Sequence, residues 1–187
     1  NIRHIVDTLF NKEARKDFFV IRKTKGSKRK KTPKLSPLAK RKKNPNSTYW
    51  REATDKIFSR IVRLRDRECM ICGKKGRPLQ NGEPIGGLDA HHIISRSQLQ
   101  HRYNLSNCIA LCKACHKFGH KGISPHSSLE AIEQFWQWLS RSPKMKEHYT
   151  FYKTHTFNKV VKITYHEQYN QLKLVESSQL KELKNYT

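Results

Sequence analysis

The stretch that decides the fold begins with Cys69-Met-Ile-Cys72 and ends with Cys112-Lys-Ala-Cys115, so that Cys112 lies 40 positions after Cys72. Two such Cys-x-x-Cys pairs are typical of a single tetrahedral zinc site, because zinc takes four thiolate ligands and stabilises a small domain. Two structural disulfides are the alternative, and they are rare in reducing compartments. The spacing therefore predicts a structural Zn²⁺ held by Cys69, Cys72, Cys112 and Cys115. We expect the fifth cysteine, Cys108, to be a small buried residue.

Four histidines and one asparagine stand between and directly after these pairs: His91, His92, Asn107, His116 and His120. A helix expected over 112–120 would place His116 and His120 on one face, within reach of one ion. Neighbours on an extended chain point in opposite directions, so one of His91 and His92 can join that ion while the other acts on a water. Imidazole, with an ordinary pKa near ~6.5, suits a base that works at neutral pH. These residue types therefore supply a neutral base and a bound cation, the two groups that hydrolysis of a phosphodiester needs.

In these motifs the sequence resembles the HNH nuclease family, whose fold is the ββα-metal motif. The His-His, Asn, His, His spacing is similar to that of the colicin-type DNase domains. The cysteine pairs, and the ten residues from Asn107 to His116, are similar to the zinc-stabilised branch common among phage endonucleases. The resemblance covers about residues 50–125. It implies an α+β fold with a small, treble-clef-like ββα-metal core held by the four-cysteine zinc site. Outside this core, charge and apolar periodicity lead us to expect flanking helices and a basic flexible arm.

The resemblance also implies a role for each motif residue in a metal-dependent DNA endonuclease. His91 would bind the catalytic divalent cation (Mg²⁺, Mn²⁺, Ni²⁺ or Zn²⁺) together with His116 and His120. His92 would be the general base that activates water, and Asn107 would fix the loop and the orientation of the base. Many family members have Asp where His91 stands, and an imidazole-rich site favours softer ions than a carboxylate does. The expected products carry 5′-phosphate and 3′-hydroxyl ends.

Charge indicates the kind of partner. The 187 residues include 39 Lys and Arg against 15 Asp and Glu, a formal net charge of +24, which favours a polyanionic partner, with nucleic acid first and an anionic membrane surface a distant second. No run approaches the ~18 apolar residues of a membrane span, and no signal-peptide pattern opens the sequence. We therefore expect no membrane partner and a cytoplasmic location, in a protein encoded by a bacterium or phage.

Basic residues gather in a stretch from Arg22 to Lys43, and Pro33, Pro37 and Pro45 are expected to break any helix there. A flexible arm of this kind binds phosphates without reading sequence, although a solubilising linker is the alternative. On the helix expected after it, Lys56, Arg60, Arg63 and Arg67 form either a DNA-facing ridge or a solvated side. The residues we expect to contact DNA are Lys28, Arg29, Lys30, Lys31, Lys40, Arg41, Lys42, Lys43, Arg96, Lys113, Lys117 and Lys121.

Apolar periodicity and turn residues divide the chain into four parts. We expect an N-terminal segment of unknown role at 1–21, the basic arm at 22–47, the nuclease domain at 48–125 and a C-terminal extension at 126–187. The elements expected are an amphipathic helix within 1–21, a helix over 48–66, a strand over 88–94, a helix from 128 to about 142, a strand over 160–165 and a short last helix. The remaining histidines, His4, His101, His126, His148, His155 and His166, are interpreted as surface or packing residues.

Besides RNA as the substrate, which the charge does not exclude, two other functions stay open at this point. One is a structure-specific nuclease for branched DNA such as a Holliday junction, because the segment from Phe58 to Asp66 loosely resembles phage recombination nucleases. The other is a zinc module that binds DNA without cutting it, although such a module has no use for His92 or Asn107. The sequence does not distinguish a monomer from a homodimer.

Overall fold

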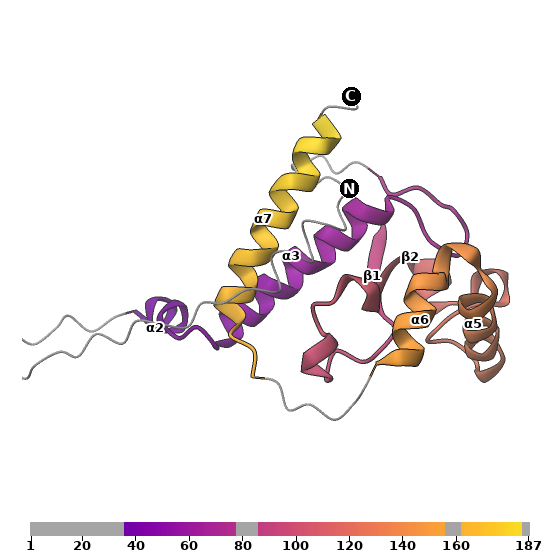
Figure 1. Cartoon of the computed structure of the whole chain (residues 1–187), viewed down its shortest axis with the longest axis horizontal. Coiled ribbons are helices and arrows are strands. Elements are labelled where there is room, and N and C mark those ends of the chain that lie inside the picture. Colours follow the sequence, from indigo (N-terminus) through magenta and orange to yellow (C-terminus); the bar gives the residue numbers. More distant parts are fainter. Residues whose placement is uncertain (1–35, 78–85, 156–161, 185–187) are drawn as a thin grey trace, which may run out of the picture. The chain divides into compact units, whose positions relative to one another are not determined.

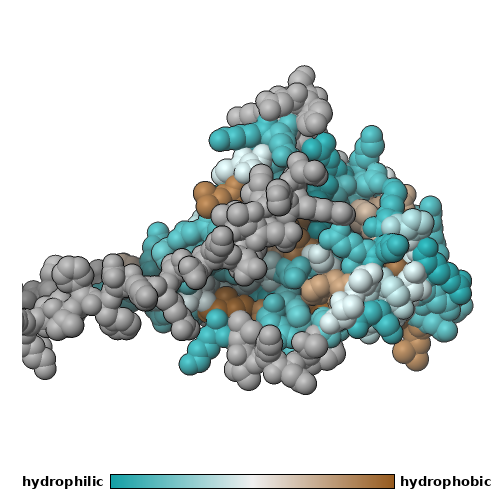
Figure 2. Space-filling model, in the orientation of Figure 1, coloured by the Kyte–Doolittle hydropathy of each residue, from teal (hydrophilic) through white to brown (hydrophobic). Residues whose placement is uncertain are grey.

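The structure is a computed structural model. It describes residues 36–77, 86–155 and 162–184, all of which belong to one compact unit spanning 35–187. No helix among these residues is long and apolar enough to cross a membrane. The face seen in Figure 2 is mostly hydrophilic, with small separate hydrophobic areas.

The centre of the fold is a two-stranded antiparallel sheet followed by a short helix. Strand β1 (Leu88–His92) pairs with β2 (Cys108–Cys112), with Leu88 opposite Cys112 and His92 opposite Cys108. Helix α4 (Lys113–Lys117) follows β2 directly. Every residue of β2 is buried, which explains its unbroken apolar sequence and the burial of Cys108. The predicted mixture of helices with a small sheet is confirmed, although the strand expected over 88–94 ends at His92.

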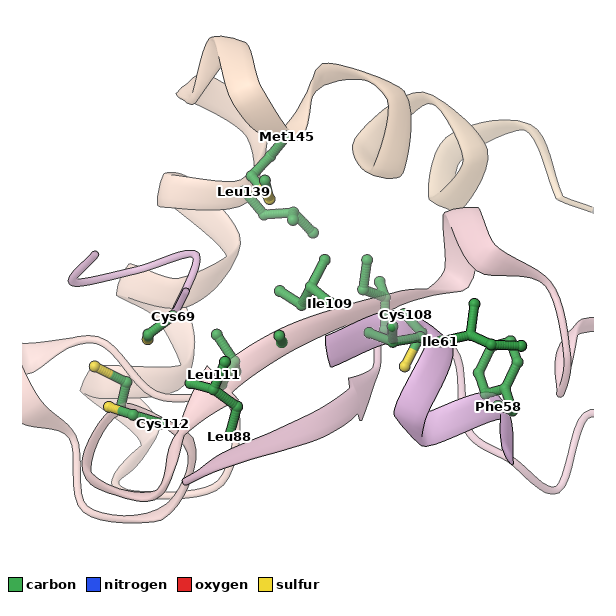
Figure 3. Close-up of a cluster of buried hydrophobic side chains, with 14 of the residues drawn as sticks. Phe58, Ile61, Cys69, Leu88, Cys108, Ile109, Leu111, Cys112, Leu139 and Met145 are labelled. Carbon is green, nitrogen blue, oxygen red and sulfur yellow. The ribbon is translucent and has the colours of Figure 1, made fainter. Parts of the chain in front are cut away.

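Helix α3 (Thr48–Asp66) covers the sheet with the apolar face that its sequence predicts, including Phe58 and Ile61 (Figure 3). Its C-terminal end is fastened to β2 by polar contacts. Asp66 Oδ2 accepts a hydrogen bond from the Ala110 amide at 2.7 Å, and Arg65 Nη2 donates one to the Cys108 carbonyl at 2.6 Å. Because of these contacts, α3 and the sheet form one rigid support for the residues of β1.

Helix α7 (Tyr165–Lys184) packs along α3 (Figure 1). Glu176 on α7 is 2% exposed and lies 2.7 Å from Arg60 Nη1, which joins the two helices by an ion pair. The prediction of a strand over 160–165 is wrong for the part of it that the structure describes. Residues 162–164 are not a strand, and Tyr165 begins the helix, while 160 and 161 lie outside the described residues.

The segment after α4 folds over the opposite side of the sheet. Helix α5 (Leu129–Arg141) begins at Ser128, whose Oγ accepts a hydrogen bond from the Ala131 amide at 3.2 Å. It contributes Leu139 to the core near Met145 (Figure 3). A 3-10 turn (Pro143–Met145) and helix α6 (Lys146–Thr154) follow. Two further 3-10 turns (Leu99–His101 and Leu105–Asn107) interrupt the loop between β1 and β2.

Two helices lie where the sequence analysis expects none, α2 and the helix α6 already described. Helix α2 (Pro37–Lys43) begins after Ser36, whose Oγ accepts a hydrogen bond from the Ala39 amide at 3.2 Å. Pro37 does not break this helix because it occupies the first helical position, where a proline needs no amide donor. The expectation of an arm without helix is therefore wrong for Pro37–Lys43. Residues 1–35, with the helix expected in 1–21 and the basic residues from Lys28 to Lys31, lie outside the described residues.

Candidate active site and metal centres

Four cysteine side chains converge at one end of the sheet. The Sγ atoms of Cys69, Cys72, Cys112 and Cys115 all lie within 4.8 Å of one another, and none of them is in a disulfide. Burial raises the pKa of the Cys69 and Cys115 thiols, so a cation is needed to hold these sulfurs as thiolates. A set of four thiols at this spacing fits Zn²⁺, which prefers tetrahedral sulfur ligands.

The local turn explains why the first pair reaches the second. The Gly73 amide donates to the Cys69 carbonyl and the Cys69 amide donates to the Lys74 carbonyl, each at 2.8 Å. Gly73 has a φ of +73°, a backbone conformation that favours glycine. The Met70 amide donates to the Ala110 carbonyl at 3.0 Å and fastens this turn to β2, from which Cys112 extends.

Three imidazoles form a second cluster on the other side of β1 from α3. The ligand nitrogens of His91, His116 and His126 lie within 4.8 Å of one another, and their ring centroids are 5.0–5.2 Å apart. Burial, followed by repulsion from His116 and His126, lowers the pKa of His91 to about 3. The ring of His91 is therefore neutral at physiological pH, which is the form that binds a metal ion. The donor set fits a divalent transition metal.

His126 reaches this cluster through a buried serine. Ser124 Oγ donates to the His116 carbonyl at 3.0 Å and accepts from the His126 amide at 3.2 Å, so it holds the loop before α5 against α4. The sequence analysis interprets His126 as an ordinary surface or packing residue. Its distance of ten positions from His116 matches no ligand spacing, and only the tertiary contact of Ser124 brings it to the cluster.

The structure does not bring His120 to the imidazole cluster. Helix α4 ends at Lys117, and Gly119 and Lys121 both have left-handed backbone conformations, with φ of +67° and +61°. The chain therefore turns before His120, and the four-residue spacing from His116 no longer places both rings on one helix face. Instead, His120 Nδ1 lies 3.6 Å from Cys115 Sγ, beside the cysteine cluster.

Asp89 orients one member of the imidazole cluster. Its Oδ2 accepts a hydrogen bond from His116 Nδ1 at 3.1 Å. A neutral imidazole that donates from Nδ1 carries its lone pair on Nε2, which is then the nitrogen available to an ion. Carboxylates commonly hold metal-binding histidines in this way. Asp89 and His91 are two positions apart on β1, so both point to the same face of the strand.

His92 points to the opposite face of β1, toward α3. Its Nε2 donates to the Arg102 carbonyl at 2.8 Å, and its ring centroid lies 5.5 Å from that of Phe58. Burial lowers the pKa of His92. The ring is therefore neutral near pH 7, with its lone pair on Nδ1. The Cys108 thiol approaches that nitrogen to 3.9 Å.

Both histidines of the pair nevertheless line one cleft. The cleft has a volume of about 700 Å³ and follows the edge of β1 that is not paired with β2. Helix α3 supplies one wall with Ser59 and Arg63, and the segment from α4 to α5 supplies the other with Lys117 and Trp136. Because the two faces of β1 meet at this edge, His91 and His92 reach the same space from opposite sides of the strand.

Asn107 holds the two ends of the loop between β1 and β2. It is fully buried. Its Oδ1 accepts from the Ile94 amide at 2.7 Å, and its Nδ2 donates to the carbonyls of Ile94 and His101, each at 3.0 Å. The loop that carries Arg102 is thereby fixed directly behind His92.

The basic residues expected to contact DNA have different positions. Arg96 and Lys117 line the cleft with Arg63, whereas Lys113 and Lys121 are exposed outside its lining, and Lys40 to Lys43 lie exposed on α2. The ridge expected on α3 is divided, because Arg60 turns to Glu176 on α7 while Arg63 faces the cleft. The sequence analysis did not single out three cleft or loop residues that contact each other: Asp55, Arg102 and Tyr103.

Comparison with known proteins gives a family match. The family model described as HNH endonuclease matches residues 69–122, a range that contains both cysteine pairs, β1, β2 and α4 and ends before His126. No curated protein and no solved structure matches the chain. The resemblance to the HNH family is thus confirmed, together with the small sheet-and-helix core expected from it. The chain therefore carries a domain of the HNH endonuclease family at residues 69–122.

Proposed function

We propose that this protein is a metal-dependent endonuclease that hydrolyses phosphodiester bonds in double-stranded DNA. The HNH family consists of nucleases that act on DNA with a divalent metal. The observation that carries the proposal is the cleft in which His92 and the cluster of His91, His116 and His126 face one space from the two sides of β1. A module that only binds DNA has no need of either group.

In this proposal the ion is held by His91, His116 and His126, and His120 supports the cysteine cluster instead. When bound, such an ion stabilises the negative charge that develops on the phosphate and on the leaving oxygen. Asp89 accepts from His116 Nδ1, so Nε2 would be the nitrogen that His116 offers to the ion. The zinc at the cysteine cluster is structural, because four thiols leave no open coordination position.

His92 acts as the general base. Its Nε2 is engaged with the Arg102 carbonyl, so Nδ1 is the nitrogen that takes a proton from water. The water oxygen attacks phosphorus, the bond from phosphorus to the 3′-oxygen breaks, and the leaving oxygen takes a proton from solvent. The products carry 5′-phosphate and 3′-hydroxyl ends.

Three cations on the walls of the cleft would bind the phosphates next to the scissile one. Arg63 extends from α3, Arg96 from the loop after β1 and Lys117 from the end of α4. Because they come from both walls, a DNA strand in the cleft meets positive charge on each side of His92. The formal charge of +24 adds a general attraction that weakens with salt.

A cleavage assay tests the proposal. The zinc-loaded protein is incubated with plasmid DNA and a four-way junction, separately with Mg²⁺, Mn²⁺, Ni²⁺ and Zn²⁺, and the DNA affinity is measured in parallel. We expect His92→Ala to abolish cleavage with little change in affinity, and His166→Ala, which changes a histidine on α7, to cut normally. If the wild-type protein cuts neither DNA with any of the four metals, it is a binding module. If it cuts the junction alone, it is a structure-specific nuclease.

A further inference from the structure

An arginine on the loop between β1 and β2 is held by a carboxylate on α3. Arg102 Nε donates to Asp55 Oδ1 at 3.0 Å, and Arg102 Nη2 donates to Asp55 Oδ2 at 2.6 Å. The Tyr103 hydroxyl donates to the same Oδ1 at 2.9 Å. Two parallel hydrogen bonds between a guanidinium and a carboxylate fix the arginine in direction as well as in distance. The Arg102 side chain is 12% exposed and that of Asp55 is 26% exposed, so this pair is partly shielded from solvent.

The main chain of the same arginine holds His92. The Arg102 carbonyl is the acceptor for His92 Nε2 at 2.8 Å. The Arg102 Nη1 atom also donates to the Arg96 carbonyl at 3.0 Å, so the side chain fastens both ends of the turn that presents this carbonyl. A continuous series of hydrogen bonds therefore runs from α3 to the imidazole, through the side chain and then the carbonyl of one residue.

We propose that Asp55 is a positioning residue for the general base His92, acting through Arg102. This inference rests on the proposed nuclease function. The carboxylate of Asp55 already accepts three hydrogen bonds from Arg102 and Tyr103, so it is not available to a metal ion although it lines the cleft. Its role is to keep the Arg102 carbonyl in front of Nε2, so that the proton stays there and the lone pair stays on Nδ1.

Removing the Asp55 carboxylate allows the Arg102 carbonyl to move away from His92 Nε2. In Asp55→Asn the amide nitrogen faces the guanidinium donors, and the two-point contact is lost. The Arg102 carbonyl then no longer favours one tautomer of His92, and molecules with the proton on Nδ1 cannot take a proton from water there. Since a general base contributes about 10²- to 10⁴-fold, we expect a partial loss of its orientation to lower kcat by roughly tenfold. Because Asp55 itself contacts no phosphate in this proposal, we expect KM for DNA to change much less than kcat.

The test compares Asp55→Asn with Glu52→Gln, which removes one negative charge from the same helix at an exposed position. Single-turnover cleavage is measured together with the ¹⁵N NMR signals of the His92 ring, at a pH where the ring is neutral. We expect Asp55→Asn alone to lower kcat and to add the Nδ1-protonated tautomer, and Glu52→Gln to change neither. An unchanged kcat and an unchanged His92 spectrum in Asp55→Asn would overturn the proposal.

Two further measurements keep the result unambiguous. If Asp55→Asn does not fold, Arg102→Lys replaces it, because lysine keeps the charge but cannot make the two parallel hydrogen bonds. The same loss of kcat and the same change in tautomer are then expected, and their absence counts against the proposal. If the wild-type protein cuts no DNA, the proposed function fails. The NMR signals of His92 still decide whether Asp55 sets its tautomer.

Discussion

Asn107→Ala is expected to destabilise the protein far more than an exposed asparagine does. The Asn107 side chain is fully buried and makes three hydrogen bonds to main-chain groups of Ile94 and His101, at 2.7 to 3.0 Å. Each is worth ~1 kcal/mol net, and a buried group left without a partner costs ~1–3 kcal/mol. Because alanine removes all three at once, we expect the free energy of unfolding to fall by about 3–5 kcal/mol. For a domain of ordinary stability that is a large share of the total.

The matched control is Asn104→Ala, three positions away on the same loop. The Asn104 side chain is exposed and accepts one hydrogen bond, from the Ser106 amide at 2.9 Å. We expect its loss to cost about 1 kcal/mol or less, as for an exposed cap. Urea unfolding of the zinc-saturated proteins, followed by tryptophan fluorescence, measures both values. An Asn107→Ala variant that loses no more than Asn104→Ala would show that Asn107 does not hold the loop.

Three more predictions concern the zinc site, a buried histidine and the α3–α7 contact. Metal analysis should find one Zn²⁺ per chain at the cysteine cluster. Either Cys112→Ser or a strong chelator should remove this zinc. Cooperative thermal unfolding should then be lost, because the small sheet depends on the zinc crosslink. Burial lowers the pKa of His148 in the folded protein. In the unfolded chain a histidine has a pKa near ~6.5, so as the pH falls the unfolded chain binds this proton at a higher pH than the folded protein does. The free energy of unfolding should therefore decrease below about pH 6.5, and urea titrations at several pH values should show a smaller decrease in His148→Gln. Glu176→Ala removes the buried carboxylate that Arg60 Nη1 contacts and should cost about 3 kcal/mol in the same urea assay, whereas the exposed Glu167→Ala should cost little.

The core of the fold could be predicted because its constraints are local in sequence. The second cysteine pair marks where α4 begins, and an apolar periodicity of 3.6 residues identifies α3 and α5, although the sequence analysis placed no strand over Cys108–Cys112. The errors arise where one residue changes the direction of the chain. Helix α4 ends at Lys117, shortly before the left-handed Gly119, rather than running to His120, and Pro37 begins α2 rather than preventing it. Helix α6 was missed because its nine polar and aromatic residues have no clear apolar face.

The candidate site could be predicted only in part. The sequence analysis singled out His91, His92, Asn107 and His116, and the structure brings His91 and His116 together. The sequence analysis missed His126 and Asp55 because their partners lie at sequence separations that no motif defines. His126 depends on the contact of Ser124 with α4, and Asp55 meets Arg102 from 47 positions away.

The most direct measurement is the metal content and the cleavage rate of the same samples, for wild type, His92→Ala, His126→Ala and His120→Ala. We expect wild type and His92→Ala to bind one zinc and one further divalent ion, with cleavage in wild type alone. We expect His126→Ala to lose the second ion and the activity together, and His120→Ala to keep both. A wild-type protein that holds both ions and leaves DNA intact, or a His92→Ala variant that cuts DNA as fast as wild type, would contradict a nuclease built around His92.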